Sequence, residues 1–155
     1  MTSSAAAVSR IDGPSARAER PIVVGIDGSP GSVAALRWAA SEARAHGRPL
    51  TAVVAYDVPA YYGYPLAPVP ELDDAQRVGG EACLDKVLAD VYGDKRPPEV
   101  RREVQQGNPA RVLIDIAEDA SLLVVGARGH GHFLLGSVSD RCMHHAACPV
   151  VVVRG

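Results

Sequence analysis

The chain has 155 residues, of which 47% are hydrophobic and 22% charged, and its formal net charge is -2. This length and composition are typical of one globular domain with a core of its own. The near-neutral charge and the lack of a Lys- or Arg-rich run argue against a nucleic-acid-binding protein. No stretch is apolar for long enough to predict a transmembrane helix.

The first 20 residues are rich in Ser, Ala and Arg. They predict a disordered tail over residues 1–20, followed by a domain over residues 21–155. This tail lacks the continuous apolar region of a secretory signal peptide, so we expect a cytoplasmic protein. The three cysteines, Cys83, Cys142 and Cys148, form no CxxC pair, and we expect them to be small buried side chains in a reducing compartment.

The predicted elements alternate between strands and helices. Residues 22–26 are wholly apolar, as in a strand that is buried on both faces. Ser29 and Pro30 then predict a helix start, and Gly47 ends that helix after His46. The remaining predicted elements are a strand over 51–56, a helix over 72–91, a strand over 100–105, a helix beginning at Pro109, a strand over 122–125, a helix over 136–146 and a strand over 149–153.

This alternation predicts an α/β fold, an open five-stranded parallel sheet with helices on both faces, as in Rossmann-like domains. In such sheets, ligands bind beyond the carboxyl ends of the strands, where the strand order reverses. Asp27, Gly28 and Ser29 follow the first strand, and a glycine-rich segment follows the fourth. We therefore expect both segments at one crevice.

The glycine-rich segment leads from a strand into a predicted helix and contains Gly126, Gly129 and Gly136. Glycines let a ligand approach backbone N–H groups closely, and a helix start adds unpaired donors, which favours phosphate binding. The segment lacks the G-x-G-x-x-G fingerprint, and Ser137 stands where a P-loop would have its lysine. Loop chemistry alone supports a phosphate site and a plain strand–turn–helix connection equally.

The chain resembles the universal stress protein family over about residues 20–154. The matching segments are Ile22-Val23-Val24-Gly25-Ile26-Asp27-Gly28-Ser29, Gly107-Asn108-Pro109-Ala110, Val124-Val125-Gly126-Ala127-Arg128-Gly129-His130-Gly131, Leu135-Gly136-Ser137-Val138-Ser139 and the closing stretch from His144 to Val153. The resemblance implies a fold like that of the adenine nucleotide alpha-hydrolases.

The resemblance also implies the family's ATP-binding subclass, marked by the pattern G-x2-G-x9-G-[ST]. It places Asp27, with Gly28 and Ser29, beside the nucleotide and uses the backbone at Ala55 to read the adenine. It further implies that ribose and phosphates are held by Gly126, Arg128, Gly129, Gly136, Ser137, Val138 and Ser139. Mg²⁺ would be bound through the nucleotide, near Asp27. For a metal site built by the protein alone, His130, His132, His144 and His145 lack a matching carboxylate or thiol motif.

One departure from the family pattern lies between Gly129 and Gly136, where this chain has six residues and the pattern has nine. The anchors on both sides are present, so ATP remains the expected ligand. A shorter arch would loosen the grip on the triphosphate, favour a smaller nucleotide such as ADP or AMP, or abolish binding.

We expect a nucleotide-dependent regulator of the stress response that is not an enzyme or is only a weak one. The alternatives are a slow ATPase, an enzyme that phosphorylates itself on Ser137 or Ser139, and a nucleotide-free interaction module. The final strand, Val150 to Val153, is apolar and would lie at a sheet edge. Such an edge, together with the family resemblance, predicts a homodimer through this strand.

Overall fold

The computed structural model describes residues 20–57, 70–95, 100–127 and 136–155. Apart from Arg20, the predicted tail lies outside these residues. The elements in the described part are β1 (Ile22–Ile26), α2 (Pro30–His46), β2 (Leu50–Tyr56), α3 (Pro70–Tyr92), β3 (Val100–Gln106), α4 (Pro109–Ala117), β4 (Leu122–Gly126), α5 (Ser137–His145) and β5 (Val150–Val153). Every predicted element is present.

The five strands form one parallel sheet in the order β3-β2-β1-β4-β5. The chain builds outward from β1 to β3 and then returns to the other side of β1 for β4 and β5. The strand order therefore reverses between β1 and β4, and β5 lies at an edge, as predicted.

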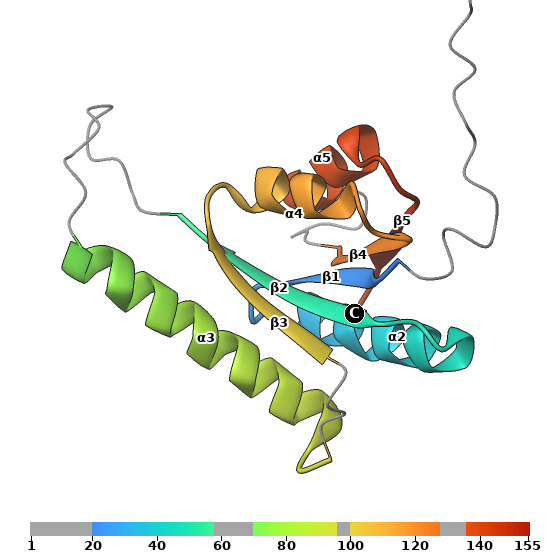
Figure 1. The fold of residues 1–155 in the computed structure, drawn as a ribbon, viewed down its shortest axis with the longest axis horizontal. Helices are drawn as coiled ribbons and strands as arrows, with labels where there is room; N and C mark the ends of the chain where they lie inside the picture. Colours follow the sequence, from blue (N-terminus) through green and yellow to red (C-terminus); the bar gives the residue numbers. More distant parts are fainter. Residues whose placement is uncertain (1–19, 58–69, 96–99, 128–135) are drawn as a thin grey trace, which may run out of the picture.

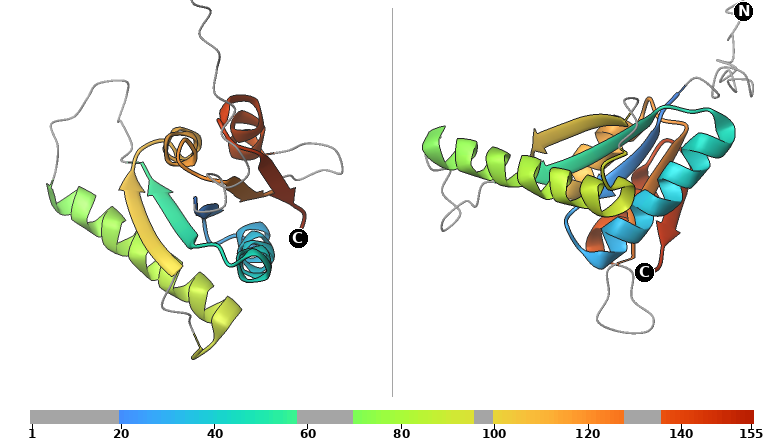
Figure 2. Two further views of the ribbon diagram at one scale, coloured as in Figure 1. Left: turned by 45° about the vertical axis from the view of Figure 1, so that its right-hand side comes forward. Right: turned by 90° about the horizontal axis from the view of Figure 1, so that it is seen from below.

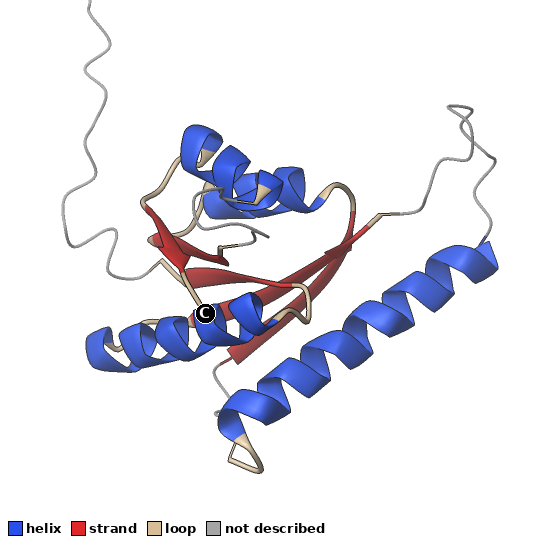
Figure 3. Cartoon of the chain, turned by 180° about the vertical axis from the view of Figure 1, so that it is seen from behind, coloured by secondary structure: helices blue, strands red, loops and turns tan. Residues whose placement is uncertain are grey.

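The helices cover both faces of the sheet (Figure 1), which confirms the predicted architecture. Helices α2 and α3 pack on one face, and α4 and α5 pack on the other, as the view from behind also shows (Figure 3). Successive residues of the central strands point to opposite faces, so Val23 and Val24 belong to different core clusters. Both residues are fully buried, which explains the continuous apolar run in β1.

The helix starts follow the expected capping chemistry. The Ser29 Oγ accepts from the Ser32 N–H (3.2 Å), and the Asn108 Oδ1 accepts from the Arg111 N–H (3.3 Å). A proline follows each cap as the first helical residue. Gly47 ends α2 in the left-handed conformation, with φ of 60°.

Helix α3 runs through Gly79 and Gly80 without a break. Gly80 is buried, and a Cβ at this position would lie 2.9 Å from Val104 Cγ1, so the glycine lets α3 approach the sheet closely. None of the ten residues of α3 that precede Gly80, residues 70–79, is buried. This part of the helix projects past the sheet (Figure 2, right) and exposes Leu72 and Val78.

The three cysteines are free. Cys142 is fully buried, as predicted, whereas Cys83 and Cys148 are only half-buried at the margins of the two core clusters. Among the described helices, none combines the length and the apolar character that crossing a membrane requires.

Candidate functional site

A pocket of about 100 Å³ lies where the strand order reverses. The carboxyl ends of β1, β2 and β4 and the starts of α2, α4 and α5 surround it, as expected for an open parallel sheet. Its lining residues are Gly25, Ile26, Asp27, Ser29, Ser32, Val53, Ala55, Pro109, Leu113, Val125, Gly126, Gly136, Val138 and Ser139.

The turn from β1 into α2 forms a polar side of the pocket. The Ser29 N–H donates to Asp27 Oδ1 (2.9 Å), which fixes the exposed carboxylate at the pocket rim. Ser32 is buried, and its hydroxyl donates to the Ser29 carbonyl (2.9 Å). This turn thus presents a carboxylate that can accept a hydrogen bond from a ligand hydroxyl.

The opposite side of the pocket is apolar. Val53 and Ala55 alternate along β2 and therefore share one face of the sheet, which is the face covered by α4. Leu113 follows Pro109 by about one helical turn and lies above that face. These side chains form a slot that suits a flat, weakly polar ring.

The backbone of Ala55 lies at the end of a strand ladder. The last paired residues of β1 and β2 are Ile26 and Val54. The Gly107 N–H donates to the Tyr56 carbonyl on the β3 side (2.7 Å), so alternation points the peptide groups of Ala55 toward the β1 side. Because β1 stops pairing there, a ligand in the pocket can approach the backbone of Ala55.

Gly126 has a packing role that the sequence did not reveal. A Cβ atom here would lie 2.6 Å from the carbonyl carbon and 2.7 Å from the carbonyl oxygen of Gly31. The absent side chain therefore lets the end of β4 pack directly against the first turn of α2. Gly126 also lines the pocket, so this packing role exists beside the predicted ligand contact.

The start of α5 has no side-chain cap, in contrast to α2 and α4. Gly136 is the N-cap residue in an extended conformation, and its carbonyl accepts from the Asp140 N–H (2.9 Å). The N–H groups of Ser137, Val138 and Ser139 belong to the first turn, where no preceding carbonyl of the same helix can accept them. These donors and the positive end of the helix dipole favour an anion.

The hydroxyl of Ser139 is committed to its own helix. Ser139 is 2% exposed, and its Oγ donates to the Gly136 carbonyl (2.9 Å). Its proton is thus already shared with the backbone, and the backbone N–H of Ser139 is the better candidate for a ligand contact.

The structure brings together most of the residues that the sequence assigned to the site. Seven of them line the pocket: Asp27, Ser29, Ala55, Gly126, Gly136, Val138 and Ser139. Gly28 and Ser137 do not line it, and Arg128 and Gly129 lie outside the described residues. Ser32, Val53 and Leu113 line the pocket without having been predicted from the sequence, although the alternation of Val53 with Ala55 along one strand indicates a shared face.

Gly28 faces helix α3 instead of the pocket. It adopts a φ of 80°, and a Cβ here would lie 3.1 Å from the Cys83 Sγ. Burial and the nearby Asp27 carboxylate raise the pKa of the Cys83 thiol.

Metal ligands do not gather in the described part of the chain, where no group of three His, Cys, Asp or Glu side chains lies together. His144 and His145 are on α5, with ring centroids 6.4 Å apart. His130 and His132 lie outside the described residues.

Comparison with known proteins matches residues 19–154 to the model of the universal stress protein family. A universal stress protein of Mycolicibacterium smegmatis is 40% identical over 144 residues, which make up 88% of this chain and 49% of that protein. One of Thermus aquaticus is 36% identical, over 87% of this chain and 98% of that protein. The chain thus spans about half the length of the mycobacterial relative.

Solved structures show the same fold. UspA from Lactobacillus plantarum is 30% identical, with a TM-score of 0.72, over 87% of this chain and 97% of that one. A universal stress protein in complex with cAMP is 26% identical, with a TM-score of 0.64, over 88% and 97% of the two chains. One from Archaeoglobus fulgidus in complex with dAMP is 25% identical, with a TM-score of 0.62, over 86% and 97%.

Proposed function

This chain belongs to the universal stress protein family, and we propose that its pocket binds an adenine nucleotide that regulates the protein in a stress response. The observation that carries the proposal is the pocket itself. It joins an apolar slot, a carboxylate and a helix N-terminus without a side-chain cap at the point where the strand order reverses. The cAMP and dAMP complexes of structurally similar proteins support this choice of ligand.

In the proposed complex, the adenine ring occupies the apolar slot between Val53 and Leu113. The backbone of Ala55, just past the end of the β1–β2 ladder, is within reach of the ring edge. Asp27 accepts a hydrogen bond from a ribose hydroxyl, and a Mg²⁺ ion carried by the nucleotide would add its hydration shell to the same carboxylate.

The phosphates lie outside the slot, at the start of α5. The enclosed volume of about 100 Å³ is smaller than the roughly 300–1,000 Å³ of typical ligand sites, so only part of a nucleotide fits inside it. The backbone N–H groups of Val138 and Ser139 are the proposed donors. ATP with Mg²⁺, which the G-x2-G-x9-G-[ST] subclass implies, is the first ligand proposed, and ADP and AMP are the alternatives because the spacing in this chain is only six residues.

Calorimetric titration with AMP, ADP and ATP, each with and without Mg²⁺, tests the proposal and ranks the ligands. The blocking variant is Ala55→Leu, which fills the slot and should weaken binding at least tenfold. Its matched control is Ala75→Leu, which adds the same side chain on the exposed part of α3 and should bind like the wild type. The proposal fails if none of the nucleotides binds at millimolar concentration, or if both variants bind equally.

A second variant separates the role of charge from that of the turn. Asp27→Asn keeps an oxygen that can accept from the Ser29 N–H, so the turn should persist. We expect weaker nucleotide binding and a smaller effect of Mg²⁺ on affinity. Affinity and Mg²⁺ dependence equal to those of the wild type would remove Asp27 from the site.

We propose a binding protein in preference to an enzyme. Self-phosphorylation on Ser139 is disfavoured because its hydroxyl is buried and donates to the Gly136 carbonyl. Ser137 is exposed at the first position of α5 and is the better acceptor of the two. Incubation with ATP and Mg²⁺ followed by mass spectrometry separates the two functions, because a binding protein stays unmodified and releases no phosphate.

We also propose that the protein forms a homodimer through β5. The two sheet edges differ in chemistry, since β3 carries Arg101, Arg102 and Glu103, whereas β5 consists of four half-buried valines. Charged edge strands oppose pairing with another chain, and an apolar edge invites it.

Two exposed apolar side chains, Trp38 and Met143, are on α2 and α5, the helices that contact β5. A Cβ on Gly155, which follows β5, would lie 3.6 Å from Ala34 Cβ, so the side of α2 that carries Ala34 and Trp38 faces the β5 edge. On α5, Val138 lines the pocket, and Met143, five residues later, is about 140° around the helix from it. Trp38 and Met143 are 37% and 41% exposed and would be covered in the dimer.

A further inference from the structure

A second concavity, a groove, lies at the amino ends of the strands, whereas the candidate nucleotide pocket lies at their carboxyl ends. Its floor includes Leu50 and Val100, the first residues of β2 and β3, and its volume is about 690 Å³. This volume is within the range of roughly 300–1,000 Å³ for small-molecule sites. The length of β2, about 20 Å at ~3.3 Å per residue, separates the two sites.

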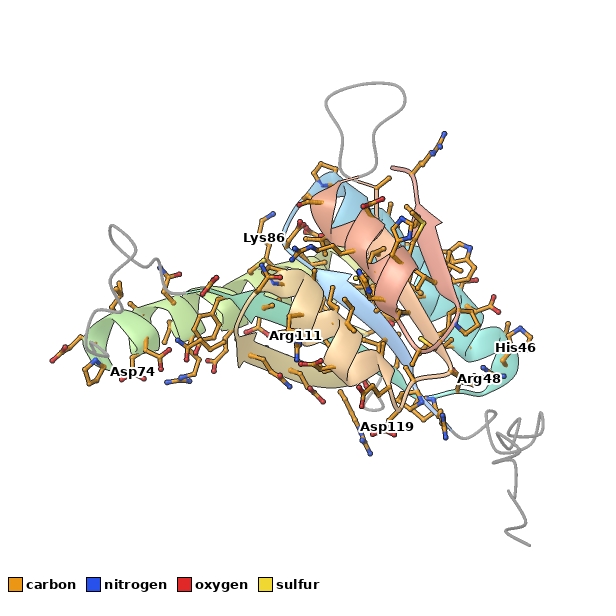
Figure 4. All side chains as sticks on the ribbon, turned by 90° about the horizontal axis from the view of Figure 1, so that it is seen from above. His46, Arg48, Asp74, Lys86, Arg111 and Asp119 are labelled. Atoms are coloured by element: carbon orange, nitrogen blue, oxygen red, sulfur yellow. The ribbon has the colours of Figure 1, made fainter. Side chains whose placement is uncertain are left out.

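Three cations line this groove. Arg44 is in the last turn of α2, Arg48 follows that helix, and Lys95 follows α3. Among the described residues that line the groove there is no Asp or Glu, and the ion pairs found in the described ranges do not involve these three side chains. Figure 4 shows Arg48 at one end of the molecule and Asp74, on the projecting part of α3, at the other.

The floor of the groove is apolar and contains one aromatic ring. Tyr92 is half-buried and packs against the core cluster beneath α2 and α3, together with Ala40 and Val100. Arg44 lines the same groove as Tyr92; burial raises the pKa of the Tyr92 hydroxyl, and the positive charge of Arg44 partly offsets this rise. The groove therefore combines an aromatic floor with a cationic rim.

We propose that this groove binds a small organic anion with an apolar or aromatic body and an acidic group such as a carboxylate, sulfonate or phosphate. The body would lie on Tyr92 and Leu50, and the acidic group would pair with Arg48 and Lys95. The concave shape and the volume favour a small molecule over a protein surface. Three cations without a neighbouring carboxylate in the described lining favour an anion. The proposal does not depend on nucleotide binding at the carboxyl ends of the strands.

Fluorescence titration with anilinonaphthalene sulfonate, an aromatic anion, tests the proposal on the full chain. We expect one bound probe per chain, and at least tenfold weaker binding by the Arg48→Gln/Lys95→Gln double variant. The matched control, Arg77→Gln/Arg141→Gln, removes the same charge from α3 and α5 outside the groove and should bind within twofold of the wild type. Ala40→Leu, which narrows the groove, should also weaken binding, and circular dichroism checks that each variant is folded.

Two further arms identify the site and the ligand class. Saturating AMP should not displace the probe, because the two sites are at opposite ends of β2. Phenylnaphthylamine, which lacks the acidic group, should bind at least tenfold more weakly than the sulfonate. Displacement by AMP, equal binding of the neutral probe, or unchanged binding by Arg48→Gln/Lys95→Gln would each overturn the proposal.

Discussion

Gly126, at the end of β4, packs against the backbone of Gly31 in the first turn of α2, so closely that a Cβ atom would lie 2.6 Å from the Gly31 carbonyl carbon. This contact holds two sides of the candidate nucleotide pocket together. It gives Gly126 a structural requirement that exists without any ligand.

Gly126→Ala should therefore lower the stability of the ligand-free protein. Backbone atoms cannot move aside as a flexible side chain does, so we expect a cost of about 1–3 kcal/mol, as for an overpacked core. Thermal unfolding without nucleotide measures it. In Gly79→Ala, the control, the new Cβ meets open space within helix α3, and stability should rise by about 0.5–1 kcal/mol. A Gly126→Ala protein that melts like the wild type but loses nucleotide binding would show that the glycine serves the ligand alone.

Ser139→Ala tests which atoms of the α5 start contact the nucleotide. Because the Ser139 hydroxyl donates to the Gly136 carbonyl, the proposed ligand contact of Ser139 is its backbone N–H. The variant should lose about 0.5–1.5 kcal/mol of stability, and its nucleotide affinity should stay within threefold of the wild type. Parallel unfolding and calorimetric titrations measure the two effects. A tenfold loss of affinity would instead make the hydroxyl a direct ligand.

The buried Cys142 thiol should lower the free energy of unfolding as the pH becomes alkaline. Burial raises the pKa of its thiol from 9.0 to about 11. Between these values the unfolded chain releases the proton while the folded protein retains it, so the unfolded state gains stability as the pH rises. The contribution is complete below about pH 9 and is lost as the pH approaches 11. Denaturant unfolding from pH 8 to 11 should show a steeper decline for the wild type than for Cys142→Ala, and parallel declines would contradict the assignment.

If the proposed homodimer through β5 forms, a negative charge introduced at Met143 should weaken it, whereas the same charge at Leu72 should not. Met143 and Leu72 are 41% and 40% exposed, but Met143 is on α5, which contacts β5, whereas Leu72 is on α3. Met143→Glu would place an unpaired carboxylate in the proposed interface and should shift the protein toward monomer by at least tenfold in dissociation constant. Leu72→Glu, on the projecting part of α3, should leave the dimer intact. Analytical ultracentrifugation of the wild type and both variants measures the fraction of dimer. A wild type that is monomeric at micromolar concentration would contradict the proposed homodimer.

The sequence by itself determined the order and limits of the elements. The apolar run of β1, the helix starts at Ser29 and Pro109 and the stop at Gly47 are local signals, because each depends on residues within one or two turns. The alternation of strands and helices then fixed a parallel sheet, since parallel neighbours need crossover connections. It also put Asp27 and Gly126 at the same edge of that sheet, because all carboxyl ends meet there.

Only the tertiary structure decided what surrounds those residues. Leu113 and Ser32 enter the pocket because α4 and α2 dock on opposite faces of the sheet, and no short-range pattern encodes that approach. In the same way, Gly126 contacts the backbone of Gly31, which is 95 positions earlier in the sequence. Gly126 could be picked out from the sequence, but its contact with Gly31 could not. The groove lined by Arg44, Arg48 and Lys95 has the same origin, since its cations come from separate segments that meet only when α2 and α3 pack side by side on one face of the sheet.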